Sequence, residues 1–209
     1  MRRILPIVVV IAAISWTPAN AQTVVPAELE ELRNPRITER SPERMLVVEA
    51  KGDPRTIGAK AFGLLFQVYY MSPETPKGML QSAPRARWPV AFDEPRTEWI
   101  GLYALPVPDS MMTVPQHDAS PGLSATLSTW EYGQTAEILH VGPYDQEAPT
   151  LTRLREYVEA EGYVLVGEHE EEYIRGPNMF GPGNPDEYVT ILRYRVNETP
   201  EGTKEESPD

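Results

Sequence analysis

The sequence predicts an α+β fold made of two pseudo-symmetric βαββ halves that share one antiparallel sheet. The first observation is a repeated order of elements, because an apolar strand, a glycine, a helix and two more strands occur over 45–107 and again over 122–196. The second is the repeat spacing of about 90 residues, which is too long for a solenoid unit. Helices segregated to one side of an antiparallel sheet define this class, so we expect both helices on one face.

The two ends of the chain are expected to lie outside this 45–196 domain. Residues 1–21 begin with two arginines, continue with a mostly apolar stretch and end in Ala19-Asn20-Ala21, which predicts a signal peptide cleaved after Ala21. The apolar stretch is shorter than the roughly 20 residues of a spanning helix. Residues 22–44 are charged and contain three prolines, so we expect a mobile linker, and we expect a disordered acidic tail over 197–209. The mature protein is therefore predicted to be periplasmic or secreted, with no stable membrane insertion.

The composition excludes several classes of function. The chain has 19 Lys and Arg and 31 Asp and Glu, so removal of Arg2 and Arg3 leaves 19 − 2 = 17 bases and a formal charge of −14. Nucleic-acid affinity depends on basic side chains that neutralise phosphates, so no nucleic-acid partner is expected. The absence of cysteine excludes disulfides, thiolate metal sites and a cysteine nucleophile. Three histidines do not favour a His-rich metal cluster, and we expect no metal, no cofactor and a monomer or weak dimer.

The first half contains a clear strand–helix unit. Residues 45–50 are apolar and favour a strand, and Gly52-Asp53-Pro54 then supplies a break, an N-cap and a proline at the first helical position. The helix is expected to end near Met71, and residues 87–92 and 99–105 are expected to form a pair of strands. The buried stripe of the helix is predicted to consist of Ile57, Ala61, Leu64, Leu65 and Val68.

The second half repeats this order. We expect one strand from about Leu123 and another that ends at His140, followed by a break at Gly142-Pro143. Asp145 is predicted to be the N-cap of the second helix, and Gly162 is predicted to end it. Strands from Tyr163 and over 186–193 complete the unit. The apolar stripe of this helix is predicted to be Leu151, Leu154 and Val158.

The acidic run 170–172 allows two interpretations. It is either a solvated charge run or the place where one acid turns inward, since Tyr173 and Ile174 continue the strand. Period-two geometry places Glu171 and Tyr173 on one face, with His169 and Arg175, and the other two acids on the opposite face. A carboxylate in an aromatic pocket would await a cation. Arg175 faces the same way and could instead pair with Glu171.

The strand over 99–105 has an aromatic face. Trp99, Gly101 and Tyr103 share it, and the glycine leaves room for a flat molecule to lie against the strand. The aliphatic residues of the opposite face are expected to pack against the helix. In the alternative interpretation, Trp99 and Tyr103 simply close the core.

Three further residues are candidates with two interpretations each. Trp130 is either a rim aromatic or plain packing, and Tyr144 is either a pocket wall or a cap of the helix. His140 ends a strand, where a histidine bonded to the backbone of the turn is the more common role.

The order and spacing of these motifs resemble the GyrI-like small-molecule-binding domain, which is also the effector-binding module of multidrug-responsive transcription activators. The resemblance covers 123–196 well and 45–107 loosely, and it implies a ligand cleft on the sheet face opposite the helices. It also links the acid of the second motif to recognition of hydrophobic cations. The matching residues are His140, Gly142 and Tyr144 in HVGPY, Glu171 and Tyr173 in EEEYI, and the closing strand 186–193.

The function expected from the residues and the resemblance is exported binding of small amphiphilic molecules, aromatic or cationic. The alternative is a hydrolase of strained-ring, cyclopropanoid-type toxins, in which Glu171 activates water and Tyr173 donates a proton. A third reading is haem binding, since the SOUL family shares the fold, but neither His117 nor His169 has the context of an axial ligand. The expected ligand-binding residues are Trp99, Tyr103, Trp130, His140, Tyr144, Glu171 and Tyr173.

Overall fold

The computed structural model describes residues 25–78, 82–89, 94–117, 121–177, 181 and 183–200. The predicted signal peptide and residues 201–209 of the predicted tail lie outside these described residues. The tail prediction is wrong at its start, because Asn197 and Glu198 belong to the last strand. The strand expected over 87–92 is described only as far as residue 89. Among the described helices, none is both long and apolar enough to span a membrane.

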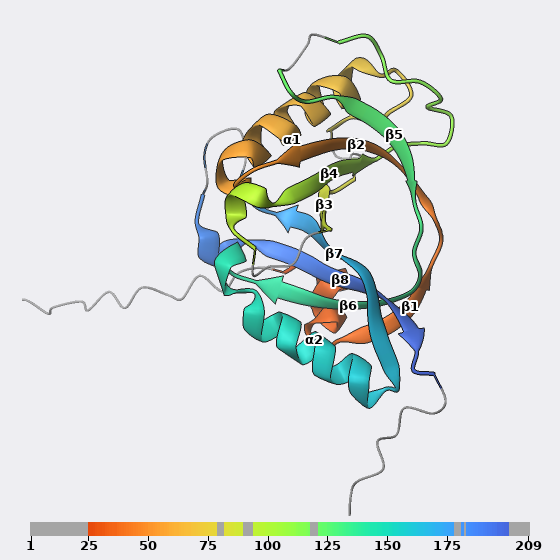
Figure 1. Ribbon diagram of the computed structural model, residues 1–209, viewed down its shortest axis with the longest axis vertical. Coiled ribbons are helices and arrows are strands. Elements are labelled where there is room, and N and C mark those ends of the chain that lie inside the picture. Colours follow the sequence, from red (N-terminus) through yellow and green to blue (C-terminus); the bar gives the residue numbers. More distant parts are fainter. Residues whose placement is uncertain are drawn as a thin grey trace, which may run out of the picture.

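The fold is an eight-stranded antiparallel sheet with two α-helices, which confirms the predicted α+β class. The strand order is β1-β6-β8-β7-β3-β4-β2-β5, and the two ends of this order do not pair in the described structure. Figure 1 shows the strongly curved sheet, with α1 (Pro54–Met71) at the top and α2 (Ala148–Ala160) at the bottom. The strands are β1 Arg36–Arg40, β2 Glu43–Lys51, β3 Arg85–Trp88, β4 Ile100–Pro106, β5 Ala125–Trp130, β6 Gly133–Val141, β7 Tyr163–Arg175 and β8 Val189–Glu198. The short 3₁₀ helices are η1 Ala27–Arg33, η3 Arg96–Glu98, η4 Tyr144–Gln146 and η5 Pro185–Glu187.

Two halves are related by pseudo-symmetry around the central β3–β7 pair. The order β3-β4-β2-β5 on one side is matched by β7-β8-β6-β1 on the other. Gly52 after β2 and Gly142 after β6 both have a φ of 136°, a conformation that favours glycine. The amide of Gly52 donates to the Trp99 carbonyl at 2.8 Å, and that of Gly142 donates to the Tyr188 carbonyl at 3.0 Å. The same turn therefore joins strand to helix in both halves.

The expected mobile linker over 22–44 is wrong for its described part, because this segment contains η1, β1 and the start of β2. β1 pairs with β6 in register, as β5 pairs with β2. Leu32 of η1 and the preceding Val25 are buried against the apolar side chains of β6 and β8. Pro26 is the N-cap of η1, and Pro35 and Pro42 lie just before β1 and β2. The prolines therefore separate the elements and do not interrupt them.

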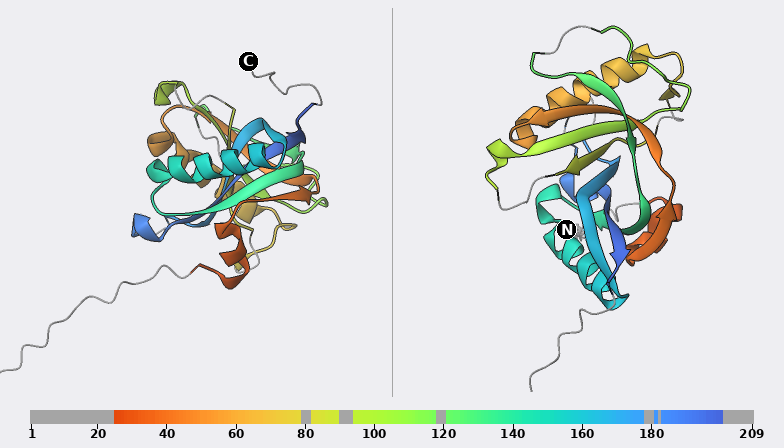
Figure 2. Two further views of the ribbon diagram at one scale, coloured as in Figure 1. Left: turned by 90° about the horizontal axis from the view of Figure 1, so that it is seen from below. Right: turned by 45° about the vertical axis from the view of Figure 1, so that its right-hand side comes forward.

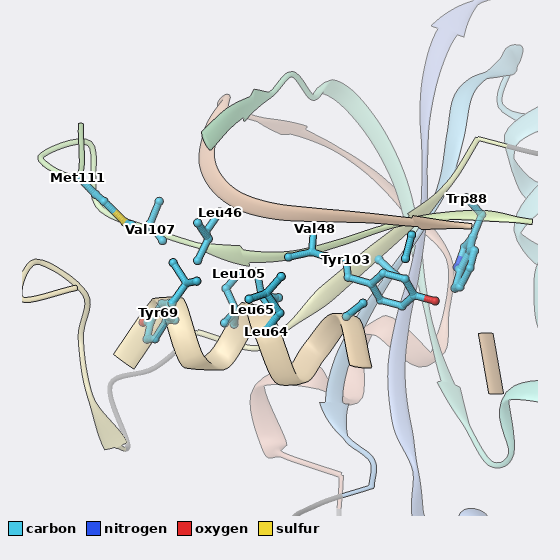
Figure 3. Packing of buried hydrophobic residues seen from close by; sticks show 14 residues of the cluster. Leu46, Val48, Leu64, Leu65, Tyr69, Trp88, Tyr103, Leu105, Val107 and Met111 are labelled. Carbon is cyan, nitrogen blue, oxygen red and sulfur yellow. The ribbon is translucent and has the colours of Figure 1, made fainter. Parts of the chain in front are cut away.

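Each α-helix packs its predicted stripe on the same side of the sheet. The side chain of Asp53 accepts from the Arg55 amide and caps α1, as expected. Figure 3 shows Leu64 and Leu65 of α1 pointing toward β2 and β4. Leu154 and Val158 of α2 pack against β6 and β8. The right-hand view in Figure 2 shows the two helices lying apart along the sheet.

Two local predictions need correction. Asp145 lies in η4, and the N-cap of α2 is Glu147, whose side chain makes no capping bond. On β4, the face that meets α1 is that of Tyr103 and not the aliphatic one, because the ring of Tyr103 lies against Gly58 of α1. The space above Gly101 is filled, since a Cβ there would lie 2.7 Å from the ring of Tyr103. Figure 3 shows this ring close to Trp88.

Candidate functional site

Strand β7 sends its acids to opposite sides of the sheet. Glu171 lies between His169 and Tyr173 at period-two spacing, and these side chains lie on the side covered by α1 and α2. Glu170 and Glu172 point to the other side. The predicted grouping of Glu171 with Tyr173 is therefore correct, whereas the expected cleft on the face opposite the helices is not where these residues lie.

A buried group of polar and aromatic side chains surrounds Glu171. We call it the helix-side cluster. The Tyr173 hydroxyl donates to Oε2 of Glu171 at 2.5 Å, and Nε2 of His169 lies 3.4 Å from Oε1. Glu171 is 7% exposed and Glu147, which enters from the start of α2, is 7% exposed as well. The helix-side cluster consists of Tyr103, Tyr144, Glu147, His169, Glu171 and Tyr173.

Burial and the charge of Glu171 raise the pKa of the neighbouring acidic groups of the cluster. Burial and the nearby Glu171 carboxylate raise the pKa of Glu147 to about 10, so that this carboxyl group is neutral at pH 7. Burial, followed by the charge of Glu171, also raises the pKa of Tyr103, Tyr144 and Tyr173. The cluster therefore offers one carboxylate beside hydroxyl and carboxyl groups that hold their protons.

Aromatic rings enclose the carboxylate. Phe62 of α1 makes edge contacts with Tyr103, at a ring distance of 5.0 Å, and with Tyr173, at 5.8 Å. Tyr144 lies 5.5 Å from Tyr173 and 5.0 Å from Tyr188. Phe62, Tyr144 and Tyr173 are partly exposed, so this side of the cluster forms its outer wall.

The other predicted site residues have different positions. His140 places one ring nitrogen 3.0 Å from the Thr150 hydroxyl and the other 3.1 Å from the Pro143 carbonyl, which matches the structural role of a turn histidine. Burial lowers the pKa of His140. Trp99 is half-buried and contacts Trp88 at 5.7 Å, on the edge of the α1 core. Trp130 does not join the cluster, since it lies on the opposite face beneath the guanidinium of Arg87, 4.0 Å from the ring centre.

Arg175 is not the counter-ion of Glu171. A register shift between Tyr173 and Arg175 interrupts the alternation of β7, and the Arg175 side chain is exposed. Among the described residues, the ion-pair contact of Glu171 is with His169.

Two members of the cluster were not expected from the sequence as site residues. Glu147 stands five residues after Gly142 in an exposed-looking stretch, and its burial follows from the 3₁₀ turn η4, which delays the start of α2. His169 belongs to the same face as Glu171, and this spacing was the available signal. One ligand atom each from Glu147, His169 and Glu171 lies within 4.8 Å of the others, so these three residues could hold a metal ion.

The opposite side of β7 carries an arginine network. Arg87 donates to Glu170 at 2.8 Å, and Arg193 pairs with Glu172 and, at 2.9 Å, with Glu137. The hydroxyl of Tyr132 accepts from Arg85 at 2.7 Å and donates to Glu170 at 3.1 Å. The network consists of Arg36, Arg40, Arg85, Arg87 and Arg193 with Glu43, Glu137, Glu170 and Glu172.

A cavity of about 390 Å³ lies away from the helix-side cluster. Its lining comes from β1, the β5–β6 turn and the ends of β7 and β8, and contains no member of the cluster. The lining residues are Glu39, Tyr132, Gly133, Gln134, Val166, Arg195, Val196 and Asn197.

Several solved structures share this fold. A hydrolase encoded by lin2189 from Listeria innocua has a TM-score of 0.63 at 24% identity, covering 79% of this chain and 92% of that chain. Another hydrolase from Listeria innocua has a TM-score of 0.62 at 22% identity, with the same coverage of both chains. The C-terminal domain of EcmrR has a TM-score of 0.58 at 14% identity, covering 79% of this chain and 98% of that chain. At these identities the likeness establishes the fold alone. No protein-family model and no curated protein matches the chain.

Proposed function

We propose that the helix-side cluster binds small organic cations that carry aromatic groups, with Glu171 as the counter-ion. The observation that supports this most is the difference between Glu171 and its two neighbours. Glu170 and Glu172 are neutralised by arginines, whereas no arginine or lysine of the described chain lies within 4.0 Å of the Glu171 carboxylate. A buried carboxylate among aromatic faces suits a cation that is itself apolar.

The neutral state of Glu147 sharpens the choice of ligand. Because its pKa is raised to about 10, the two buried carboxyl groups present one negative charge together at neutral pH. A monovalent cation would balance this charge. An anion of the same shape would face Glu171 without any cationic partner, so we expect it to be rejected.

Access is proposed from the end of the strands where three short helical turns lie. Figure 1 shows η3, η4 and η5 at the left edge of the view, and the ring contact of Tyr144 with Tyr188 places η4 beside η5. Trp99 follows η3, Tyr144 opens η4 and Tyr188 follows η5. Rotation of the partly exposed Tyr144 would expose Tyr173 and, behind it, Glu171.

The experiment is a titration with tetraphenylphosphonium, followed by calorimetry and tryptophan fluorescence. Tetraphenylborate, which has the same shape and the opposite charge, should bind much more weakly. Glu171→Gln keeps the volume and removes the charge, so it should weaken phosphonium binding about tenfold to a hundredfold.

Glu168→Gln is the matched control, because it makes the same chemical change on the same strand outside the cluster. It should leave phosphonium affinity unchanged. Equal affinity of folded Glu171→Gln and the native protein would refute the proposal.

A second candidate is hydrolysis of strained-ring compounds. It is favoured by the neutral Glu147 carboxyl beside the Glu171 carboxylate, which is the arrangement of a general acid and a general base. The similarly folded Listeria innocua chains named as hydrolases add weight to it. Glu171, hydrogen-bonded to Tyr173, would activate water, and Tyr173 or Glu147 would protonate the opened ring. If Glu171→Gln binds a cyclopropane-containing alkylator normally but no longer opens it, this candidate replaces simple binding.

We also propose that the protein acts outside the cytoplasm after removal of residues 1–21. The two arginines, the apolar stretch and the small residues before Gln22 support this. Mass spectrometry of the protein from separated cell fractions tests it. An intact Met1 in the cytoplasmic fraction would contradict export.

A further inference from the structure

We propose that Glu147, His169 and Glu171 form a binding site for a divalent transition-metal ion, with Zn²⁺ preferred over Mg²⁺. The three side chains come from two elements, the start of α2 and the middle of β7, and all three are buried. One ligand atom of each lies within 4.8 Å of the other two. This inference goes beyond organic cation binding and does not depend on it.

The His169–Glu171 pair already has the spacing of two metal ligands. Nε2 of His169 lies 3.4 Å from Oε1 of Glu171. Zinc bonds to nitrogen and oxygen are about 2.0–2.2 Å long, so two ligands at a tetrahedral angle lie about 3.4 Å apart. The other oxygen of Glu171 accepts the hydroxyl of Tyr173 at 2.5 Å, which fixes the carboxylate and leaves Oε1 for the metal.

Glu147 supplies a second and independent observation. Its Oε1 atom is buried and has no hydrogen-bond partner in the described structure, although Glu147 is only 7% exposed. A buried oxygen without a partner costs free energy, and a metal ion would satisfy it. The site is therefore distinct from a cluster of surface acids, whose oxygens are solvated.

The chemistry of the donors selects the class of ion. One imidazole and two carboxyl groups suit Zn²⁺ and similar transition metals, with the proton of Glu147 released to solvent when the metal binds, whereas Mg²⁺ prefers oxygen donors and keeps several waters. A metal ion here would bring positive charge to the carboxylate that the organic cation uses. Metal and organic cation should therefore exclude each other.

The test starts with the whole mature chain freed of metal by a chelator. Zn²⁺ is titrated against a chromophoric competitor and by calorimetry, with Mg²⁺ as the second ion. We expect one Zn²⁺ site per chain and no comparable binding of Mg²⁺. His169→Gln and Glu147→Gln should each weaken Zn²⁺ binding by more than about a hundredfold, since even a residue that only supports a ligand contributes tenfold to a hundredfold.

His117→Gln is the matched control, since it removes an imidazole from the loop before β5, where the ring bonds to the Pro115 carbonyl. Its Zn²⁺ affinity should equal that of the native protein. Circular dichroism establishes whether each variant is folded. If His169→Gln does not fold, the Zn²⁺ affinity of Glu147→Gln alone decides the result.

The two proposals fail separately. Loss of Zn²⁺ binding in Glu147→Gln and His169→Gln, with the fold retained and with Zn²⁺ binding unchanged in His117→Gln, supports the metal site. Absence of Zn²⁺ binding in the native protein, or undiminished binding in both variants, overturns it. Neither of these outcomes affects the phosphonium titration, which depends on Glu171 and the aromatic wall.

Discussion

Buried glutamates lie on both sides of β7, but they have different partners on the two sides. On one side Glu170 and Glu172 lie within a network of arginines, and on the other Glu171 lies among tyrosines with His169 as its ion-pair contact. Burial is similar, since Glu170 is 2% exposed and Glu171 is 7% exposed. The difference is therefore in the partners and not in the depth.

This contrast separates carboxylates that stabilise the fold from carboxylates that are available for a ligand. A buried ion pair is strongly destabilising when one partner is removed, because the other remains as an uncompensated charge. A buried carboxylate without an arginine or lysine beside it carries that cost already in the native state. Measurements on the two sides should accordingly differ in size and in sign.

The largest effect is expected for Arg193→Met. This change leaves Glu137 and Glu172 without the buried guanidinium that contacts both. The free energy of unfolding, measured by urea denaturation, should fall by about 3–5 kcal/mol. Lys60→Met, on the exposed face of α1, should change it by less than about 0.5 kcal/mol. Equal effects of the two variants would show that the network does not stabilise the fold.

The pH dependence of stability should have opposite signs on the two sides. Although burial opposes ionisation, the nearby Arg193 keeps the pKa of Glu137 and Glu172 below 4.5, so their contribution is present above pH 4.5 and is lost as the pH falls. The pKa of Glu147 is raised to about 10 by burial and by Glu171. Above pH 4.5 the unfolded state loses this proton and the native state keeps it, so stability falls as the pH rises toward 10.

Glu147→Gln tests this sign directly. In the presence of a chelator, the native protein should lose up to about 2.7 kcal/mol of unfolding free energy between pH 6 and pH 8, which corresponds to one proton. The variant should lose less. An identical pH profile for both proteins would mean that Glu147 is ionised in the native state.

Neighbouring acids give the most closely matched pair of variants. Glu170→Gln removes the charge that Arg87 and Arg193 contact, so the unfolding free energy should fall by about 2 kcal/mol. Glu171→Gln should be neutral or stabilising, because the Tyr173 hydroxyl can still donate to the amide oxygen. Chemical denaturation of both variants at pH 7 checks this, and a reversed order would contradict the assignment of the two sides.

The smallest effect is expected for a pair of tyrosines. Tyr132→Phe removes a hydroxyl that bridges Arg85 and Glu170, which should cost about 1–2 kcal/mol. The hydroxyl of Tyr103 is buried and has no hydrogen-bond partner in the described structure, so Tyr103→Phe should be neutral or slightly stabilising. Thermal unfolding of the two variants measures the difference.

Local signals predicted much of the fold. Asp53-Pro54 fixed the start of α1, and Gly162, with a φ of 82°, ended α2 where expected. The corresponding prediction for Asp145 was wrong, because a single 3₁₀ turn places the helix start two residues later. Sequence pattern identifies a cap residue more readily than it distinguishes the first turn of an α-helix from a 3₁₀ turn.

The faces of the strands were the harder problem. Alternation states which residues share a face, and it correctly grouped Glu171 with Tyr173. It does not state which face meets the helices, and this is why Tyr103 was assigned to the wrong side. The role of Trp130 depends on Arg87, which is distant in sequence, and no local pattern reveals such a contact.

The spacing of the sequence repeat could have predicted β1. β5 begins 125 − 36 = 89 residues after β1, and β6 begins 133 − 43 = 90 residues after β2. The strand expected near Leu123 therefore required a counterpart near residue 36. The charged residues and prolines around it concealed this counterpart.

The exchange of first strands between the two halves, in which β1 and β5 each join the other half, suggests how this fold arose. Each half gives its first strand to the edge of the other half's sheet, since β1 pairs with β6 and β5 pairs with β2. Neither half can complete its own sheet, and an exchange of this kind is how two copies of one chain form a domain-swapped dimer. Duplication and fusion of such a dimer would produce this architecture. On the shared seam, Ala86 of β3 lies directly opposite Glu171 of β7, so β7 supplies the buried carboxylate there and β3 supplies only a small apolar side chain.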